Sequence, residues 1–293
     1  MSRLKRDRRK FVAFILCNGR PEKVFTYGSL RKMGYSGPII LIVDNLDKTK
    51  DGYIEKYGNE VYVFDKPGTA AKCDRGDNRP GLGMAMFARN ACFDVAEDLG
   101  YTHFVQLDDD YTHYQYRFNE KMQYTTDKAC RNLDKVFNAL NNFLDDTTVD
   151  SVAIAQGGDF IGGSSNQFAE APMIMRKCMN SWFCRTDRRI QFSMRMNDDV
   201  TTYILLGSRG RLFFTTNQVS LVQPVTQSVP GGMSEVYKES GTYLKTFYSI
   251  MASPSSVKVG ILMGQSGEAR LHHNVSWKHT VPKILRETWR KTA

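Results

Sequence analysis

The first hundred residues of the chain alternate between continuous apolar runs and amphipathic stretches. Each run is bounded by polar or turn-forming residues, which is typical of a buried strand. After Pro21, apolar residues recur every three positions until Gly34, and this spacing predicts a helix. Strands that alternate with helices indicate a parallel sheet with helical crossovers. We expect strands at residues 11–17, 38–43 and 61–64, and a second short helix at 53–57.

The same periods continue through the rest of the chain. An apolar stripe at helical spacing runs over residues 84–99, and two further segments show the same period. The whole pattern predicts an α/β fold, with a mostly parallel mixed sheet flanked by helices in a single large domain. We expect helices at 84–99, 133–144 and 200–207, and strands at 151–155 and 257–263.

Three adjacent carboxylates, Asp108, Asp109 and Asp110, end a strand-like run at residues 101–107. They repel one another, and a hard divalent cation is the simplest way to keep them ionised. Alternate side chains of an extended segment share a face, so Asp108 and Asp110 form an Asp-x-Asp pair. Ligands of open α/β sheets bind at this end of the strands. A solvated acidic turn is the alternative interpretation.

A second acidic cluster, Asp198 and Asp199, precedes the predicted helix at 200–207. An Asp at this place is often only a helix N-cap. Across a cleft from a metal-bound phosphate, either carboxylate could instead deprotonate an acceptor hydroxyl. Near the end of the chain, His272 and His273 offer imidazole ligands for the same metal. Neighbouring side chains point apart in an extended segment, so we expect only one of them to bind it.

Charge and composition narrow the classes of function. The 293 residues carry a net charge of +9, and six of the first ten are Lys or Arg. These basic clusters could line a nucleic-acid groove or form a solvated basic surface. No apolar run approaches the ~20 residues of a membrane helix, and the start of the chain does not read as a signal peptide, so we expect a soluble cytoplasmic protein. Other basic clusters lie at Arg185, Arg188 and Arg189, at Arg209 and Arg211, and over 278–291.

Other motifs exclude or leave open particular sites. The chain has no Walker A sequence, and Gly81 and Gly83 do not form a dinucleotide fingerprint, which favours a diphosphate held by a metal. The six cysteines form no C-x-x-C pair, so buried free thiols are expected. An aromatic run after the Asp triplet could stack on sugars or bases, or could pack under a loop; it comprises Tyr111, Tyr114, Tyr116, Phe118 and Tyr124.

Several motifs together resemble a known class of enzymes. Asn18-Gly19-Arg20, the Asp after the second strand, Arg89-Asn90, LDDD, a later DD and a late His are similar to GT-A nucleotide-sugar glycosyltransferases. More narrowly, the segments ARNACFDVAEDLGYTHFVQLDDDY, AQGGDFIGG and MNDDVTTYILLGSRGRLFFT resemble the TET-associated glycosyltransferases of bacteriophages. Those enzymes are thought to glycosylate hydroxymethylated pyrimidines in DNA.

The resemblance implies a GT-A-like fold and a role for each motif residue. Asp108 and Asp110 would hold Mn²⁺ or Mg²⁺, with His272 or His273 as a further ligand. Asp198 or Asp199 would be the base if the reaction inverts the anomeric centre. The donor would be a UDP-sugar and the acceptor DNA. The residues implied in nucleotide binding are Asn18, Arg20, Asp44, Arg89, Asp108 and Asp109.

The expected organisation follows from these assignments. Residues 1–10 would be a basic flexible arm, and 11–293 one domain with a nucleotide-sugar half at 11–118 and an acceptor half at 119–293. The aromatic run, Trp182, Phe183 and Arg185–Arg189 are candidates for the DNA surface. Oligomeric state stays open. The alternatives are a GT-A enzyme with a glycan or protein acceptor, a metal-dependent nuclease or nucleotidyltransferase, and a non-catalytic DNA-binding module.

Overall fold

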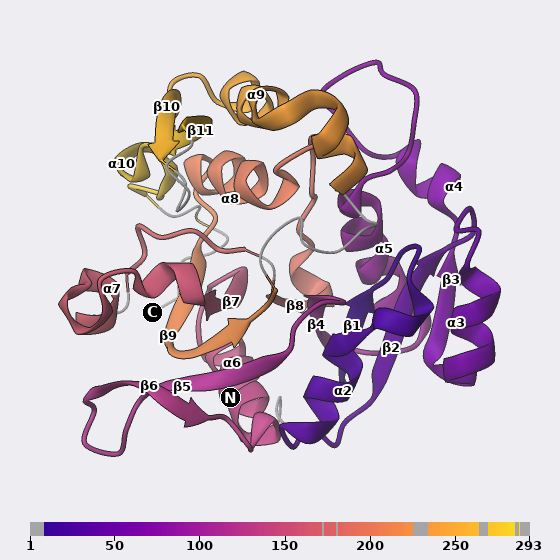
Figure 1. Cartoon of the computed structure of the whole chain (residues 1–293), viewed down its shortest axis with the longest axis horizontal. Helices are drawn as coiled ribbons and strands as arrows, with labels where there is room; N and C mark the ends of the chain where they lie inside the picture. The colour runs from indigo at the N-terminus through magenta and orange to yellow at the C-terminus, as the bar shows by residue number, and fades with distance from the viewer. Residues whose placement is uncertain are drawn as a thin grey trace.

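In the computed structural model, a nine-stranded sheet runs through the protein in the order β3-β2-β1-β4-β8-β7-β9-β5-β6 (Figure 1). The structure describes residues 9–171, 173–179, 181–224, 234–263, 269–284 and 287. A separate antiparallel pair, β10 and β11, lies near the C-terminus. The strands are β1 (Phe11–Leu16), β2 (Ile39–Asp44), β3 (Val61–Phe64), β4 (His103–Asp108), β5 (His113–Phe118), β6 (Tyr124–Ala129), β7 (Ser151–Gln156), β8 (Trp182–Arg185), β9 (Phe213–Val222), β10 (Val257–Met263) and β11 (Ala269–Val275).

Helices cover both faces of the sheet, as the strand periodicity requires. On β1, Ala13 and Ile15 pack with residues of α2 and α6, whereas Val12 and Phe14 pack with residues of α5 and α8. Successive strand side chains point to opposite faces, so a continuous apolar strand needs a helical layer on each side. The helices are α2 (Phe25–Lys32), α3 (Lys50–Tyr57), α4 (Lys66–Ala70), α5 (Ala85–Asp98), α6 (Leu133–Asp146), α7 (Gln167–Glu170), α8 (Asp198–Ser208), α9 (Ser234–Ala252) and α10 (Trp277–Thr280).

The α/β class and the single mixed sheet flanked by helices are confirmed. The predicted strands at 61–64 and 257–263 have the observed bounds, and the others differ by one or two residues at their ends. Strands β8, β9 and β11 and the β5–β6 hairpin were not expected. The four residues of β8 are too few for a period to show in the sequence.

Strand β8 is the one reversed strand between two parallel groups. It is antiparallel to β4 on one side and to β7 on the other. Strand β7 therefore runs in the same direction as β4, and β9 is parallel to β7. The carboxyl ends of β1, β2, β4, β7 and β9 consequently meet at one edge of the sheet, and the Asp triplet lies at this edge.

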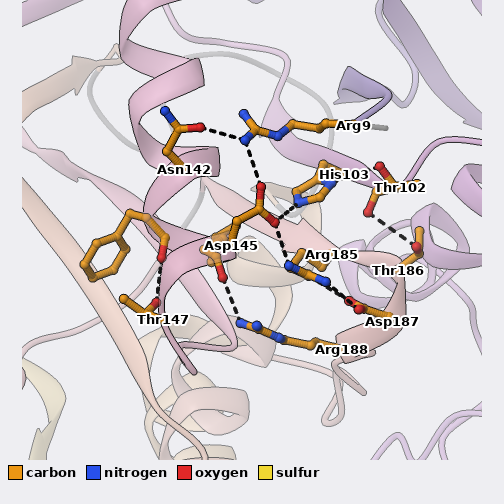
Figure 2. Close-up of polar contacts among 12 residues, drawn as sticks. Arg9, Thr102, His103, Asn142, Asp145, Thr147, Arg185, Thr186, Asp187 and Arg188 are labelled. Atoms are coloured by element: carbon orange, nitrogen blue, oxygen red, sulfur yellow. Dashed lines mark hydrogen bonds and ion pairs between the residues drawn. The ribbon is translucent and has the colours of Figure 1, made fainter. Parts of the chain in front are cut away.

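The opposite edge of the sheet holds a buried polar network centred on Asp145 of α6 (Figure 2). Its carboxylate accepts hydrogen bonds from Arg9 at 2.8 Å and Arg185 at 2.6 Å, and bonds His103 Nε2 at 2.9 Å. Arg185 also binds Asp187 with two hydrogen bonds. Burial opposes ionisation of Asp145, but His103, Arg9 and Arg185 outweigh burial and lower its pKa. The network fixes the end of α6 to β4 and β8.

This network corrects the prediction of a DNA surface at Arg185–Arg189. Arg188 donates to the carbonyls of Leu144 and Val149, and Arg189 pairs with Asp94. These cations stabilise the fold at the edge away from the Asp triplet, and Arg211 likewise binds Asp150. Trp182 and Phe183 are fully buried, so they are core residues and not part of an acceptor surface.

Three other sequence predictions concern the basic arm, the cysteines and membrane-spanning helices. Residues 1–8 of the predicted basic arm lie outside the described residues, and Arg9 is bound to α6. All six cysteines are free and five are buried, which confirms buried thiols. Among the described residues, we find no helix with the length and apolar character needed to cross a bilayer.

Because burial keeps His103 neutral, acid should destabilise the fold. Burial lowers the pKa of His103, so the folded state binds fewer protons than the unfolded state. Stability should therefore be complete above the unfolded value near 6.5 and fall as pH decreases through it. The free energy of unfolding would be measured in urea at pH 7.5 and 5.5. We expect its decrease between the two pH values to be smaller in His103→Gln than in the wild type, by up to about 1 kcal/mol. An equal pH dependence in both proteins would contradict the assignment.

Candidate active site

Motif residues from three neighbouring parallel strands meet at the carboxyl edge of the sheet. Asn18, Gly19 and Arg20 follow β1, Asp44 ends β2, and Asp108 ends β4. Strands β1 and β4 are parallel neighbours, and Leu16 lies opposite Asp108. The loop after β1 and the Asp triplet after β4 are therefore side by side. Residues distant in sequence therefore lie together at one edge of the sheet.

The buried carboxylate of Asp44 accepts three hydrogen bonds. Lys66 of α4 donates to it at 2.8 Å and the Asn18 amide at 3.1 Å, while the Leu46 backbone N–H occupies its other oxygen. The nearby carboxylate of Asp47 accepts the Gly19 N–H at 2.8 Å. These bonds hold the loop after β1 against the end of β2, so Asp44 positions Asn18.

Asp109 forms a buried ion pair with Arg20. The guanidinium Nε donates to one carboxylate oxygen at 2.7 Å, and Nη2 contacts the other. Burial raises the pKa of Asp109, and the bonds from Arg20 act in the opposite direction. Asp109 therefore anchors Arg20, whereas Asp108 is bound by Arg89.

Arg89 of α5 connects the two acidic motifs. Its Nη2 donates to Asp108 at 3.1 Å and its Nε to Asp198 at 3.0 Å, and only 5% of its side chain is exposed. Burial disfavours the charged guanidinium, but Asp108, Asp198 and Asp199 together raise its pKa. The cation thus lies between carboxylates that are 90 positions apart in sequence, as their numbers show.

Asp110 carries a buried oxygen without a hydrogen-bond partner. Its Oδ1 is inaccessible to solvent and contacts no donor among the described residues. Burial and the charges of Asp108 and Asp109 raise the pKa of Asp110 to about 7. Unpaired buried carboxylate oxygens are costly. A divalent cation between Asp108 and Asp110 would supply the missing partner, so this donor set fits the hard metal expected from the sequence.

Helix α8 begins at Asp198, with Asn197 as its N-cap residue. Of the two interpretations left open for this cluster, the N-cap role for an Asp is therefore wrong: Asp198 and Asp199 occupy the first turn, where the helix dipole favours negative charge. Burial and the neighbouring Asp199 and Asp108 charges raise the pKa of Asp198 to about 6, against the opposing effect of Arg89. Asp199 accepts the N–H of Val200 at 2.8 Å.

Asn197 joins α8 to α9 and β11. Its backbone is left-handed, with φ 54°, and its amide Nδ2 lies 2.7 Å from the carbonyl of Lys245 and 2.9 Å from Ser249 Oγ. The same amide is 3.3 Å from Nδ1 of His273. Asn is one of the few residues that tolerate this conformation. The residue therefore sets where both the acidic turn and the imidazole lie.

The two histidines differ from the prediction in their orientation. Their rings stack with centroids 4.5 Å apart, so they do not point to opposite sides of β11. Burial, His272 and Lys245 lower the pKa of His273 to about 4, which keeps it neutral at pH 7. Within the part of the chain that the structure describes, no three His, Cys, Asp or Glu side chains form a group able to hold a metal ion. The imidazole ligand stays a prediction.

The aromatic run after the triplet is mostly core. Tyr111 and Tyr114 are fully buried, Tyr116 packs against the same cluster, and Phe118 and Tyr124 stack edge to face on the hairpin. Of the two readings left open by the sequence, packing is correct for Tyr111 and Tyr114.

The family model for TET-associated glycosyltransferases matches residues 11–232. The chain belongs to the TET-associated glycosyltransferase family. The match spans the loop after β1, the Asp triplet, Arg89 and the Asp198–Asp199 turn. The resemblance inferred from the motifs is thereby confirmed, and the chain is a glycosyltransferase by family.

Two solved structures have a similar architecture. Glucosyl-3-phosphoglycerate synthase from Mycobacterium tuberculosis, solved with Mg²⁺ and uridine diphosphate, is 9% identical with a TM-score of 0.48, covering 91% of this chain and 88% of its own. TarS from S. aureus is 13% identical with a TM-score of 0.45; the match covers 74% of this chain but 37% of TarS. No curated protein sequence matches.

Several residues of this TET-associated glycosyltransferase site were not found by sequence reasoning. Lys66, Asp47 and Asn197 have no motif of their own, and Thr26 is a buried residue of α2 whose hydroxyl donates to the Asp108 carbonyl at 2.6 Å. The same hydroxyl accepts the N–H of Tyr111. The one available signal was the adjacency of Asn197 to the DD pair.

Removing Arg89 should destabilise the protein strongly. Arg89→Met deletes the cation but keeps much of the apolar volume, leaving Asp108 and Asp198 as repelling, partly buried carboxylates. We expect a loss of about 3 kcal/mol in the free energy of unfolding, measured by chemical denaturation at pH 7.5. The exposed Arg131→Met is the matched control and should change little. A loss below about 1 kcal/mol would show that the bridge is not a main stabilising contact.

Two substitutions at Asn197 separate its backbone role from its side-chain role. Asn197→Gly accepts the left-handed backbone but deletes the amide, whereas Asn197→Ala also places a β-carbon in that conformation. Both variants should be less stable than the wild type, and the alanine variant should be the weaker by about 1 kcal/mol. Urea unfolding of the pair measures this difference. Equal stabilities would argue against strain at this N-cap.

Proposed function

We propose that the protein transfers a sugar from a UDP-sugar to the hydroxymethyl group of a modified pyrimidine in DNA, with Mn²⁺ or Mg²⁺ as cofactor. Membership of the TET-associated glycosyltransferase family supports sugar transfer over the nuclease and DNA-binding alternatives. The name of the family, together with the motif resemblance, supports a hydroxymethylated DNA acceptor. The observation that carries the proposal is the partnerless buried oxygen of Asp110 beside Asp108, at the edge where α/β sheets bind ligands.

The donor site would be built on the loops after β1, β2 and β4. Asp108 and Asp110 would hold the metal, with His272 or His273 as a further ligand. When bound, the metal stabilises the negative charge of the departing diphosphate. Asn18 and Arg20, held in place by Asp44 and Asp109, would contact the nucleotide. Arg89 donates to both Asp108 and Asp198, so its role would be to orient Asp108.

Asp199 is our candidate for the base that receives the acceptor proton. Asp198 is bound by Arg89 at 3.0 Å, whereas Asp199 is bonded by a backbone N–H of its own helix turn. A hydroxymethyl group has a pKa far above 7, so its proton would leave as the new bond forms, and an ionised carboxylate can accept it at that moment. This step applies to an inverting reaction. Asp198 would then hold Arg89 in place beside it.

We assign the binding of the acceptor to the second half of the chain. A base within a duplex must be unstacked before a sugar can reach it, unless the acceptor is single-stranded. The acidic turn of α8 and the histidines of β11 come from residues 119–293, which we assign to the acceptor half. Residues 11–118 would form the nucleotide-sugar half.

Mass spectrometry of nucleosides tests the reaction directly. DNA containing hydroxymethylcytosine or hydroxymethyluracil would be incubated with the protein, Mn²⁺ and a panel of UDP-sugars, then digested. We expect a pentose or hexose mass shift on one modified base. If no donor produced a shift on any DNA while UDP bound in a metal-dependent way, the acceptor would instead be an already glycosylated base, a glycan or a protein.

An Asp110→Asn variant ties the activity to the proposed metal site. The substitution keeps the shape of the side chain but removes a ligand charge. We expect transfer and Mn²⁺-dependent UDP binding to fall by at least about 100-fold, with an unchanged melting temperature. The exposed Asp127→Asn on β6 is the matched control. Full activity of Asp110→Asn would reject the metal assignment.

A further inference from the structure

The segment between α4 and α5, residues 72–83, presents three cationic side chains that form no ion pair among the described residues, and it also carries the exposed carboxylate of Asp74. We call it the basic loop. Lys72 and Arg79 are exposed and Arg75 is half-buried. Among the described residues, none of the three pairs with a carboxylate, and the bond we find for an Arg75 side chain runs to the Arg79 carbonyl. This differs from Arg185, Arg189 and Arg211, which are all paired.

Hydrogen bonds from Arg195 tie residues 77–81 of the basic loop to the rest of the protein. Arg195 donates to both oxygens of Asp77, at 2.6 and 2.7 Å, and also to the carbonyls of Arg79 and Gly81. The Tyr248 hydroxyl of α9 donates to the same carboxylate. The hydrogen bonds from Arg195 hold the pKa of Asp77 well below its usual range. The carboxylate of Asp77 is therefore engaged within the protein, and these bonds fix the backbone around Arg79.

The basic loop adjoins the carboxylate cluster of the proposed site. Met194 and Arg195 donate backbone hydrogen bonds to the carbonyls of Asp74 and Arg75, at 2.9 Å each. Gly76 has a left-handed backbone at this point, with φ 73°, and a β-carbon there would meet the side-chain sulfur of Met194. Asp198 follows three residues after Arg195. At its other end the loop leads into α5, and Arg89 lies about one helical turn from the start of that helix. Figure 1 shows the loop passing beside α9.

We propose that the basic loop binds the phosphates of the acceptor DNA strand next to the nucleotide being modified. The inference rests on the proposed function, because it assigns a contact for that acceptor. Lys72, Arg75 and Arg79 are separated by three and four positions along one segment, which suits a linear polyanion more than one compact anion. Phosphate contacts of this kind position a nucleic acid without reading its sequence. The hydrogen bonds that fix the backbone around Arg79 reduce the entropy lost when the strand binds.

The salt dependence of DNA binding tests this contact. The loop variant would carry Lys72→Gln, Arg75→Gln and Arg79→Gln. The matched control would carry Lys32→Gln, Arg131→Gln and Lys135→Gln, which removes three exposed cations around the end of α2 and the start of α6. Binding of a fluorescent 20-nucleotide single strand would be measured by anisotropy from 50 to 300 mM NaCl. Each lost phosphate contact reduces the slope of log K against log salt by about 0.7.

We expect the slope of the loop variant to fall by about 2, and that of the control to equal the wild type. The loop variant should also raise the KM for modified DNA in the transfer assay. If the wild type transferred sugar to DNA but both variants kept its slope, the inference would be overturned while the proposed function stood. A loop variant that lost UDP affinity with an unchanged DNA slope would place the loop at the donor and also overturn it. A wild type with neither DNA binding nor transfer would reject both.

Discussion

The site depends on one buried guanidinium placed between two carboxylates. Arg89 neutralises Asp108 from β4 and Asp198 from α8 at the same time. Without it, the acidic ends of a strand and a helix would repel at short range in a poorly screened environment. The cost of burying Arg89 is offset only because both partners are present, so the two acidic motifs and the cation must be kept or lost together.

The pair between Arg20 and Asp109 repeats this principle on the other side of the triplet. Consecutive Asp residues thereby have different tasks: Asp108 is bound by Arg89, Asp109 is bound by Arg20, and Oδ1 of Asp110 has no hydrogen-bond partner among the described residues. Neutralising two of the three carboxylates internally leaves a local negative charge that a single divalent cation can balance. The triplet thus concentrates its unmet charge at one residue.

Local patterns predicted much of this protein, and long-range contacts explain the rest. Apolar period and turn residues located β1 to β4, α5 and α8, and the DDD and DD motifs marked the carboxyl edge correctly. The burial of Tyr111, Tyr114, Trp182 and Phe183 was not predictable, because aromatic residues look alike in a core and on a binding surface. The pairing of Arg185 with Asp145, and of Arg195 with Asp77, joins segments 40 and 118 positions apart, which no local spacing reveals.

The insertion of β8 between β4 and β7 also has a consequence for folding during synthesis. Strands β1 to β4 form a contiguous group that can pair as soon as residue 108 has left the ribosome. The outer side of β4 then stays unpaired until β8, which follows β7 in the chain, has been made. Open strand edges are templates for aggregation. While the N-terminal half is being synthesised, the edge of β4 is unpaired. This is therefore the stage of synthesis at which the protein most needs a chaperone.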